Sequence, residues 1–119
     1  MSKKLSVVVP CYNESLNINS THQRIKKNIE KITDNYEIIF VDDGSTDESA
    51  EILEKSAQDE KNLKVLQFSR NFGHQSAMFA GIEYSSGDGI FLIDADLQDP
   101  PEKFQEMYEK WRSGYDVVY

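Results

Sequence analysis

Four short, almost continuous apolar segments constrain the fold of this chain more than any other feature. They lie at residues 5–9, 36–41, 63–68 and 89–93, and most of their residues are valine, isoleucine, leucine or phenylalanine. Apolar runs without strict alternation are typical of parallel strands that are buried on both faces of a sheet. The sequence therefore predicts four strands in one mostly parallel sheet.

Between these segments, apolar residues recur at the spacing of amphipathic helices. The first set comprises Ile18, His22, Ile25, Ile29 and Ile32, and the second comprises Ala50, Leu53 and Ala57. Strands that alternate with helices favour an α/β layered domain with right-handed crossovers. The length of 119 residues suits one such domain and leaves no room for a second core.

Polar residues mark where two of the helices start. Ser45 and Glu48 have the spacing of a capping box, which predicts a helix that begins beside Ser45. Asp99 and Pro100 predict the start of a later helix, and Gly114 predicts its end. The apolar stripe of that later helix comprises Phe104, Met107, Tyr108 and Trp111.

The last five residues, 115–119, have the pattern of a fifth strand that stops without a turn or a polar tail. We expect this segment to lie apart from the fourth strand or to be poorly ordered, because Gly114 gives the chain little freedom to cross the sheet. The sequence thus looks truncated inside a domain, on its C-terminal side.

Charge and composition exclude several classes of protein. The 21 acidic and 13 basic residues give a net charge of -8, the wrong sign for a surface that binds nucleic acid or anionic lipid. The single cysteine, Cys11, allows no intramolecular disulfide and suits a small buried position. No apolar run approaches the roughly 18 residues that a membrane-spanning helix needs. We therefore expect a soluble, cytosolic chain without a nucleic-acid partner.

Acidic residues follow three of the four predicted strands. Glu14 follows the first, Asp42 and Asp43 follow the second, and Asp94 and Asp96 follow the fourth. If the first three strands are ordered 3-2-1 and the fourth lies beyond the first, these loops converge at one edge of the sheet. Clustered carboxylates repel one another, which implies a cation, and oxygen ligands favour Mg²⁺ or Mn²⁺ over zinc. Such an ion would also accept phosphate oxygens of a nucleoside diphosphate.

Four motifs then carry a resemblance to a known family: VVVPCYNES, VDDGSTD, SRNFGHQSA and DADLQDPPE. In this order and spacing they resemble glycosyltransferase family 2 over almost the whole chain. Within that family the chain is most similar to the branch of bactoprenol glucosyltransferases and dolichol-phosphate mannose synthases. The resemblance implies a GT-A fold, which is a Rossmann-like sheet flanked by helices. It also implies a nucleotide-sugar donor, Mg²⁺ or Mn²⁺, and inversion at the anomeric carbon.

The resemblance further implies which residues bind the donor. Pro10, Tyr12 and Glu14 would lie against the base and ribose of the nucleotide sugar. Asp42 and Asp43 match the acidic pair that recognises the base, since a carboxylate can accept the ring N–H of uracil or guanine.

The remaining matches concern the metal and the donor's surroundings. Asp94 and Asp96 match the catalytic DXD pair, of which one would hold the metal directly and the other would act through the ribose or a coordinated water. Gln98 would be a further metal ligand. Arg70 and Gln75 fall in a segment that the family places near the donor, although the match assigns them no individual role.

Each of these sites also has a purely structural interpretation. The acidic pair after the second strand suits a turn before Gly44, and the DXD pair suits a solvated loop. Tyr12 would then be a packing residue, and Glu14 would be a first-turn charge favoured by the helix dipole. His74 is expected to mark a helix N-terminus rather than to act as a base.

The sequence as a whole predicts the donor-binding part of an inverting, metal-dependent glycosyltransferase. We expect it to pass a hexose from a UDP-sugar or GDP-sugar to a polyprenyl phosphate, an anionic nucleophile that depends little on a general base. The acceptor side and any membrane segments would follow residue 119, so this chain alone is expected to be inactive. The full-length protein would lie at the cytoplasmic face of the membrane.

Four other classes of protein share some features with this sequence. A soluble family 2 transferase that glycosylates a sugar hydroxyl stays open, as does a catalytically idle module that binds nucleotide and metal. A receiver-type signalling domain is disfavoured, because its acidic pair should follow the first strand and its phosphorylated aspartate the third. A dinucleotide-binding dehydrogenase is disfavoured, because no G-x-G-x-x-G follows the first strand.

Overall fold

The structure is a computed structural model, and it describes residues 4–93 and 103–112. Within these residues, strands and helices alternate, as an α/β domain requires. In chain order the elements are β1 (Leu5–Cys11), α1 (Ile18–Ile29), β2 (Tyr36–Asp42), α2 (Ser49–Asp59), β3 (Leu63–Gln67), α3 (His74–Tyr84), β4 (Gly89–Leu92) and α4 (Phe104–Arg112).

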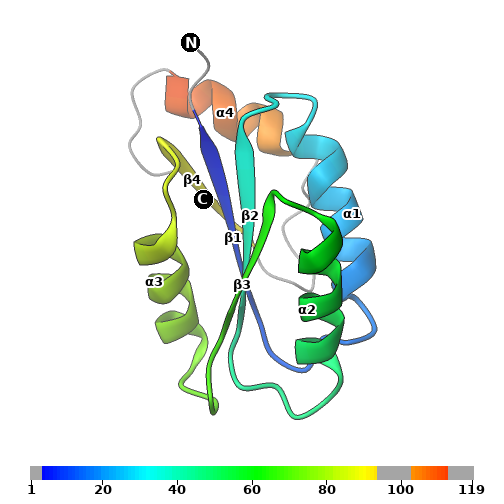
Figure 1. The fold of residues 1–119 in the computed structure, drawn as a ribbon. Coiled ribbons are helices and arrows are strands. Elements are labelled where there is room, and N and C mark those ends of the chain that lie inside the picture. Colours follow the sequence, from blue (N-terminus) through cyan, green and yellow to red (C-terminus); the bar gives the residue numbers. More distant parts are fainter. Residues whose placement is uncertain (1–3, 94–102, 113–119) are drawn as a thin grey trace.

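The four strands form one parallel sheet in the order β3-β2-β1-β4 (Figure 1). This order, with β4 on the far side of β1, meets the condition under which the acidic loops were expected to converge. The chain steps from β1 outward to β2 and β3 and then returns across the sheet to β4. The topological switch point therefore lies at β1, between β2 and β4.

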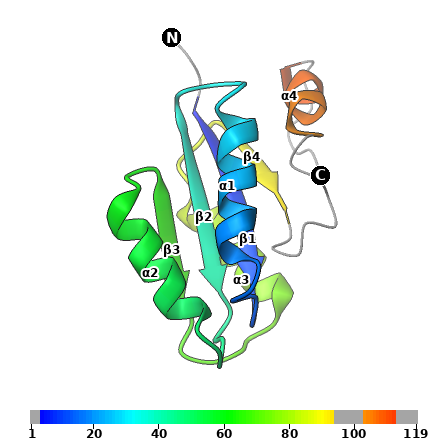
Figure 2. The same ribbon diagram turned by 90° about the vertical axis from the view of Figure 1, so that its right-hand side faces the viewer.

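Helices cover both faces of the sheet (Figure 2). The core on the side of α1, α2 and α4 includes Ile25, Leu53 and Phe104, whereas the core on the side of α3 includes Val8 and Ala77. The crossovers from β1 to β2 and from β2 to β3 run in the same direction, so right-handed connections place α1 and α2 on one face of the sheet. The crossover from β3 to β4 runs in the opposite direction and places α3 on the other face. The sheet is thus a central layer between two layers of helix.

Burial explains why the apolar runs are continuous in β1 and β2. Every residue of both strands is buried, because each strand has a neighbour on either side and helices on both faces. On the α3 face the helix backbone approaches β1 so closely that a Cβ on Gly81 would lie 2.3 Å from Cγ1 of Val8. A glycine at this position therefore permits the tight contact between α3 and the sheet.

The start of α2 differs from the prediction. The helix begins at Ser49, with Glu48 at the N-cap and no side-chain cap, so the expected capping box of Ser45 and Glu48 does not form. Ser45 instead hydrogen bonds to Asp42, and its hydroxyl oxygen accepts the backbone N–H of Asn13. The hydroxyl that would have capped the helix therefore joins two loops.

The last helix, α4, packs on β4 through its aromatic residues. The rings of Phe104 and Phe91 lie 5.4 Å apart, and Tyr108 and Trp111 pack partly buried against the same core. These three residues confirm the predicted apolar stripe. The side chain of Met107 lies outside the description, as do Asp99, Pro100, Gly114 and residues 115–119, so the expectations for them stay predictions.

No helix within residues 4–93 and 103–112 combines the length and the apolar character that crossing a membrane requires. A buried carboxylate lies at the amino ends of the strands, on the α3 face of the sheet.

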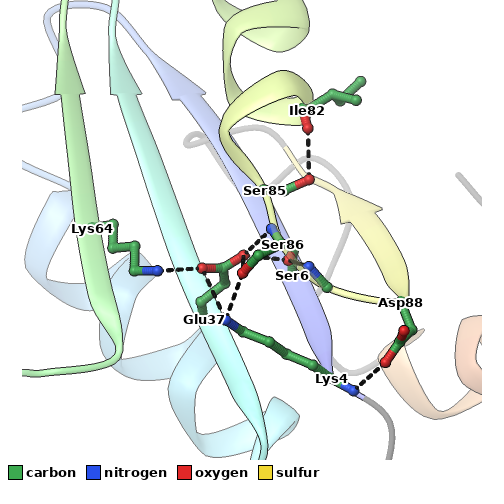
Figure 3. Close-up of polar contacts among 9 residues, drawn as sticks. Lys4, Ser6, Glu37, Lys64, Ile82, Ser85, Ser86 and Asp88 are labelled. Carbon is green, nitrogen blue, oxygen red and sulfur yellow. Dashed lines mark hydrogen bonds and ion pairs between the residues drawn. The ribbon is translucent and has the colours of Figure 1, made fainter.

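This carboxylate belongs to Glu37, whose side chain is 2% exposed (Figure 3). It accepts hydrogen bonds from the ammonium of Lys64 at 2.7 Å, from the hydroxyl of Ser6 at 2.6 Å and from the backbone N–H of Ser86 at 2.7 Å. Lys4 adds a longer ion pair at 3.5 Å. Glu37 thus joins β1, β2, β3 and the segment between α3 and β4 at the end of the sheet opposite the predicted site.

Burial opposes the ionisation of Glu37, but the hydrogen bonds from Lys64, Ser6 and Ser86 outweigh it and lower the pKa of its carboxyl to about 2. The group therefore stays ionised at neutral pH. Buried charges are tolerated when they are paired and hydrogen bonded, and Glu37 meets both conditions.

Candidate functional site

The candidate site lies at the carboxyl edge of the sheet, where three loops meet beside the end of β4. We call them the β1–α1 loop (residues 12–17), the β2–α2 loop (residues 43–48) and the β3–α3 loop (residues 68–73). In open parallel sheets, ligands bind in the crevice at this edge, next to the switch point. The topology therefore brings the predicted donor-binding segments together.

Pro10 and Cys11 end β1 inside this crevice, and both are buried. Within the described residues, the hydrogen bond between β1 and the β4 side that lies nearest this edge runs from the Ile93 N–H to the Val8 carbonyl, at 3.1 Å. Residue 10 is the next residue whose backbone N–H would face β4, and proline has no N–H to donate. Pro10 thus donates no backbone hydrogen bond toward β4 at the switch point.

Tyr12 and Glu14 lie on either side of Asn13 in the β1–α1 loop. The side chain of Tyr12 is 43% exposed, so its ring is available to a ligand at this edge. Glu14 is half-buried; its carboxylate accepts a hydrogen bond from the Asn17 amide at 3.0 Å. Both predicted residues therefore sit at the crevice, one open to solvent and one held at the start of α1.

Asp42 is the last residue of β2 and is 2% exposed. One of its oxygens accepts both the backbone N–H and the hydroxyl of Ser45. This geometry is an Asx-type turn, in which a short acidic side chain bonds to backbone a few residues onward. Asp42 therefore shapes the β2–α2 loop at the floor of the crevice.

Asp43, at 3% exposed, connects the β2–α2 loop to the β3–α3 loop. Its carboxylate accepts the backbone N–H of Phe72 at 2.8 Å, the backbone N–H of Gly73 at 3.0 Å and the side-chain amide of Asn71 at 3.2 Å. The Gly73 N–H also lies 3.3 Å from the other oxygen, so each oxygen has two donors, and these fill the roughly four acceptor positions of a carboxylate. Asp43 thus orients the neighbouring loop, and a ligand N–H would take the place of one of these donors.

Gly44 packs directly against the backbone of the β3–α3 loop. It has a φ of 71°, a left-handed conformation that side chains disfavour. A Cβ at this position would lie 2.2 Å from the carbonyl carbon of Arg70 and 2.4 Å from the nitrogen of Asn71. Glycine is therefore required both by the turn and by the close approach of the two loops.

Arg70 and Gln75 lie at the outer rim of the site. The guanidinium of Arg70 is exposed and stacks over the Phe72 ring, 4.5 Å from its centre. Gln75 is exposed in the first turn of α3, directly after His74, the residue that begins this helix. The structure thus brings the Arg70 backbone against the acidic loop, while Gln75 lies exposed at the start of α3.

The pKa of the Cys11 thiol reflects the negative charge around the end of β1. Burial, together with the negative charges of Asp42, Glu14, Asp47 and Asp43, raises the pKa of Cys11 to about 12. The thiol is therefore protonated and inert, as expected for a small buried residue. Its surroundings confirm that acidic side chains from two loops converge on one place.

The predicted metal ligands Asp94, Asp96 and Gln98 lie outside the described residues, although Asp94 follows Ile93 directly in the chain. Within the described ranges, 4–93 and 103–112, no group of three His, Cys, Asp or Glu side chains is arranged to hold a metal ion. Two carboxylates and an amide oxygen form the hard donor set that Mg²⁺ and Mn²⁺ prefer. The chemistry of these three residues therefore fits a divalent metal, and their placement stays a prediction.

Sequence reasoning missed the residues that hold the first two loops together. Asn13, Asp47 and Ser49 exchange hydrogen bonds between the β1–α1 and β2–α2 loops. The available signal was an asparagine two residues after the end of a strand, since asparagine tolerates left-handed backbone and bonds to nearby N–H groups. Its partner lies 33 residues away, which local pattern reading cannot supply.

The sequence matches glycosyl transferase family 2 over residues 6–119. The chain is 54% identical over 114 residues to "Uncharacterized glycosyltransferase YkcC" of Bacillus subtilis, covering 96% of this chain and 35% of that protein. It is 44% identical over 117 residues to the undecaprenyl-phosphate 4-deoxy-4-formamido-L-arabinose transferase of Photorhabdus laumondii, covering 98% of this chain and 36% of that protein. The chain thus spans about a third of the length of these curated relatives.

Solved structures show the same fold. The mannosyltransferase PcManGT from Pyrobaculum calidifontis, in complex with GDP-Man and Mn²⁺, superposes with a TM-score of 0.77 at 23% identity, covering 93% of this chain and 32% of that chain. Residues 1–349 of S. aureus TarS, in complex with UDP, superpose with a TM-score of 0.68 at 27% identity, covering 92% of this chain and 32% of that chain.

These likenesses confirm the GT-A fold that the sequence motifs implied. The family match covers all three loops of the candidate site and the segment after β4. The fold, the position of the loops at the switch point and the sequence match agree with one another, and this chain belongs to glycosyl transferase family 2.

Proposed function

We propose that this chain is the donor-binding part of an inverting, metal-dependent glycosyltransferase that passes a hexose from a UDP-sugar or GDP-sugar to a polyprenyl phosphate. The observation that carries the proposal is the convergence of the β1–α1 and β2–α2 loops beside the end of β4, in a chain of this family. The activity and substrates of the whole protein belong to the proposal as well.

Donor recognition would use the described loops. Tyr12, with its ring 43% exposed, offers a stacking surface for a base, and aromatic rings stack on any base because every base has a π face. The Asp43 carboxylate would accept the ring N–H that uracil and guanine share, in place of one of the loop donors that it now binds. Relatives support the nucleotide class, since TarS is solved with UDP at 27% identity.

The negative crevice would repel a diphosphate on its own, so a cation is needed. Asp94, Asp96 and Gln98 would hold Mg²⁺ or Mn²⁺, and the bound ion would supply Lewis-acid stabilisation of the diphosphate leaving group. Asp94 and Asp96 are also the proposed catalytic residues of this chain. Asp94 directly follows Ile93 in the chain, and the Ile93 N–H is hydrogen bonded to β1.

The acceptor assignment rests on the relatives. The Photorhabdus protein is named as an undecaprenyl-phosphate transferase, and a phosphate oxygen of such a lipid is already anionic. In a single displacement, that oxygen forms a bond to the anomeric carbon as the bond to the diphosphate oxygen breaks, and the configuration inverts. A lipid acceptor would place the full-length protein at the cytoplasmic face of the membrane.

Calorimetry tests the metal requirement. We expect UDP or GDP to bind this chain at least roughly tenfold more tightly with Mg²⁺ or Mn²⁺ than in EDTA, a difference of about 1.4 kcal/mol. Asp94→Ala and Asp96→Ala should remove that difference while the proteins stay folded by circular dichroism. Asp34→Ala is the control, because Asp34 is exposed before β2, at the opposite edge of the sheet. Equal affinity in EDTA would refute the metal bridge.

A second test concerns recognition of the base. Asp43→Asn should weaken UDP or GDP binding by about 1.5 kcal/mol, because it removes a charge-assisted hydrogen bond. Its amide would also face the N–H of Gly73, which the carboxylate now accepts at 3.0 Å. Asp34→Asn makes the same charge change far from the site and should leave binding unchanged. If Asp43→Asn binds like the wild type, Asp43 serves the turn alone.

A further inference from the structure

Asn13 is the feature of the site that no sequence motif explained. It has a φ of 53°, and among the described residues it alone combines a side chain with positive φ. The left-handed conformation costs roughly 1 kcal/mol for most residues, and asparagine tolerates it best. The conformation turns its side chain toward the β2–α2 loop rather than toward its own helix.

The amide oxygen of Asn13 accepts two backbone N–H groups of that loop. The distances are 2.8 Å to the nitrogen of Thr46 and 3.2 Å to the nitrogen of Asp47. In the opposite direction, the N–H of Asn13 donates to the hydroxyl oxygen of Ser45 at 2.9 Å, and that hydroxyl donates to Asp42. Asn13 is therefore bonded to three successive residues of the neighbouring loop.

Two further bonds extend the connection along the β1–α1 loop. The N–H of Glu14 donates to the Ser49 hydroxyl at 3.1 Å, and the N–H of Ser15 donates to the Asp47 carboxylate at 3.2 Å. Asn13 both donates a hydrogen bond to the β2–α2 loop and accepts hydrogen bonds from it. Its neighbours in the chain are Tyr12 and Glu14, the two proposed donor-binding residues of the same loop.

Resting on the proposed donor binding, we propose that Asn13 is a positioning residue, which holds Tyr12 and Glu14 at a fixed place relative to Asp42 and Asp43. The nucleotide would then meet two loops that are already locked together. A ligand that must order two loops on binding loses affinity, and loops ordered beforehand avoid that loss. The Asn13 side chain is exposed and joins loops rather than strands, so its effect falls on binding more than on the core.

Three substitutions test this role, with UDP or GDP in the presence of Mn²⁺ as the probe in calorimetry. Asn13→Ala should weaken binding about tenfold, because it removes the acceptor and disfavours the left-handed backbone. Asn13→Gly keeps the backbone conformation and removes the acceptor, so it should also weaken binding. Asn13→Asp keeps an acceptor oxygen and tolerates the same φ, so it should restore most of the affinity.

The control is Asn19→Ala, which makes the same change at an exposed position of α1 and should bind like the wild type. Thermal unfolding of Asn13→Ala should stay within roughly 5 °C of the wild type. Binding by Asn13→Ala equal to the wild type, no recovery in Asn13→Asp, or unfolding of Asn13→Ala at the assay temperature would each overturn the positioning role. Failure of the wild type itself to bind either nucleotide would instead refute the proposed function on which the role rests.

Discussion

Replacing Gly44 with alanine is expected to lower the free energy of unfolding by about 3 kcal/mol and to weaken nucleotide binding in the same protein. Two costs add together. The φ of 71° is left-handed, and the new Cβ would lie 2.2 Å from the carbonyl carbon of Arg70. That atom belongs to the backbone, so no side-chain rotation relieves the clash, and the β2–α2 and β3–α3 loops must separate.

The separation would act on the site through Asp43, the residue before Gly44. Its bonds to the N–H groups of Phe72 and Gly73 cross between the same two loops, at 2.8 and 3.0 Å. Urea denaturation measures the loss of stability, and calorimetry with UDP or GDP measures the loss of binding.

A second variant at this position separates the two costs. Asn tolerates left-handed backbone but carries the same Cβ, so Gly44→Asn should be nearly as unstable as Gly44→Ala if the clash dominates. A Gly44→Ala protein with wild-type stability and wild-type binding would show that the loops do not meet as the structure describes.

Replacing Glu37 with glutamine is expected to lower the free energy of unfolding by roughly 3 kcal/mol at pH 7. The side chain is 2% exposed and accepts hydrogen bonds from Lys64, Ser6 and the Ser86 N–H. Glutamine has a similar shape, but it has one acceptor oxygen and no charge to pair with Lys64. The substitution therefore leaves several donors around one buried amide, whose single oxygen cannot accept hydrogen bonds from all of them.

The effect should depend on pH in one direction. The pKa of Glu37 lies at about 2 in the folded chain, below its ordinary value of 4.5, so its stabilising contribution is complete above pH 4.5. That contribution is lost as the pH falls from about 4.5 to about 2, because the carboxylate becomes protonated. The difference in stability between the wild type and Glu37→Gln should therefore shrink over this range.

Glu54→Gln is the matched control for this series. Glu54 is exposed on α2, and exposed substitutions usually change stability by less than about 0.5 kcal/mol. Chemical denaturation at pH 7, 4.5 and 3 gives the comparison. A constant difference between the wild type and Glu37→Gln across these values would contradict an ionised, hydrogen-bonded Glu37.

Backbone hydrogen bonds stabilise the neighbouring carboxylates of the acidic loops. Asp42, Asp43 and Asp47 each accept hydrogen bonds from backbone N–H groups of the loops. For Asp47, burial raises the pKa but the bonds from Ser49 and Ser15 outweigh it and lower the pKa overall. The proposed metal would therefore be held by Asp94, Asp96 and Gln98, and it would offset the repulsion between these loops and a diphosphate.

Much of the fold could be predicted because its signals are local. Continuous apolar runs indicated the buried strands, and the spacing of residues such as Ile25 and Leu53 indicated the helices, since both depend on the period of a single element. The strand order entered only as a condition, because right-handed crossovers alone do not fix which strand lies beside which, and the structure supplies it. The matching motifs identified the family, because each lies directly after a strand end.

The contacts between loops could not be predicted in the same way. Ser45 had the spacing of a helix cap, yet its hydroxyl bonds to Asp42 and Asn13, because the β1–α1 loop lies beside it in the folded chain. Glu37 gave no sign in the sequence that it would be buried, since its partners Ser6, Lys64 and Ser86 come from distant segments. Sequence pattern thus determines which elements form and which family they build, whereas three-dimensional packing chooses the partner of each polar group, because hydrogen bonds depend on distances that a linear pattern does not contain.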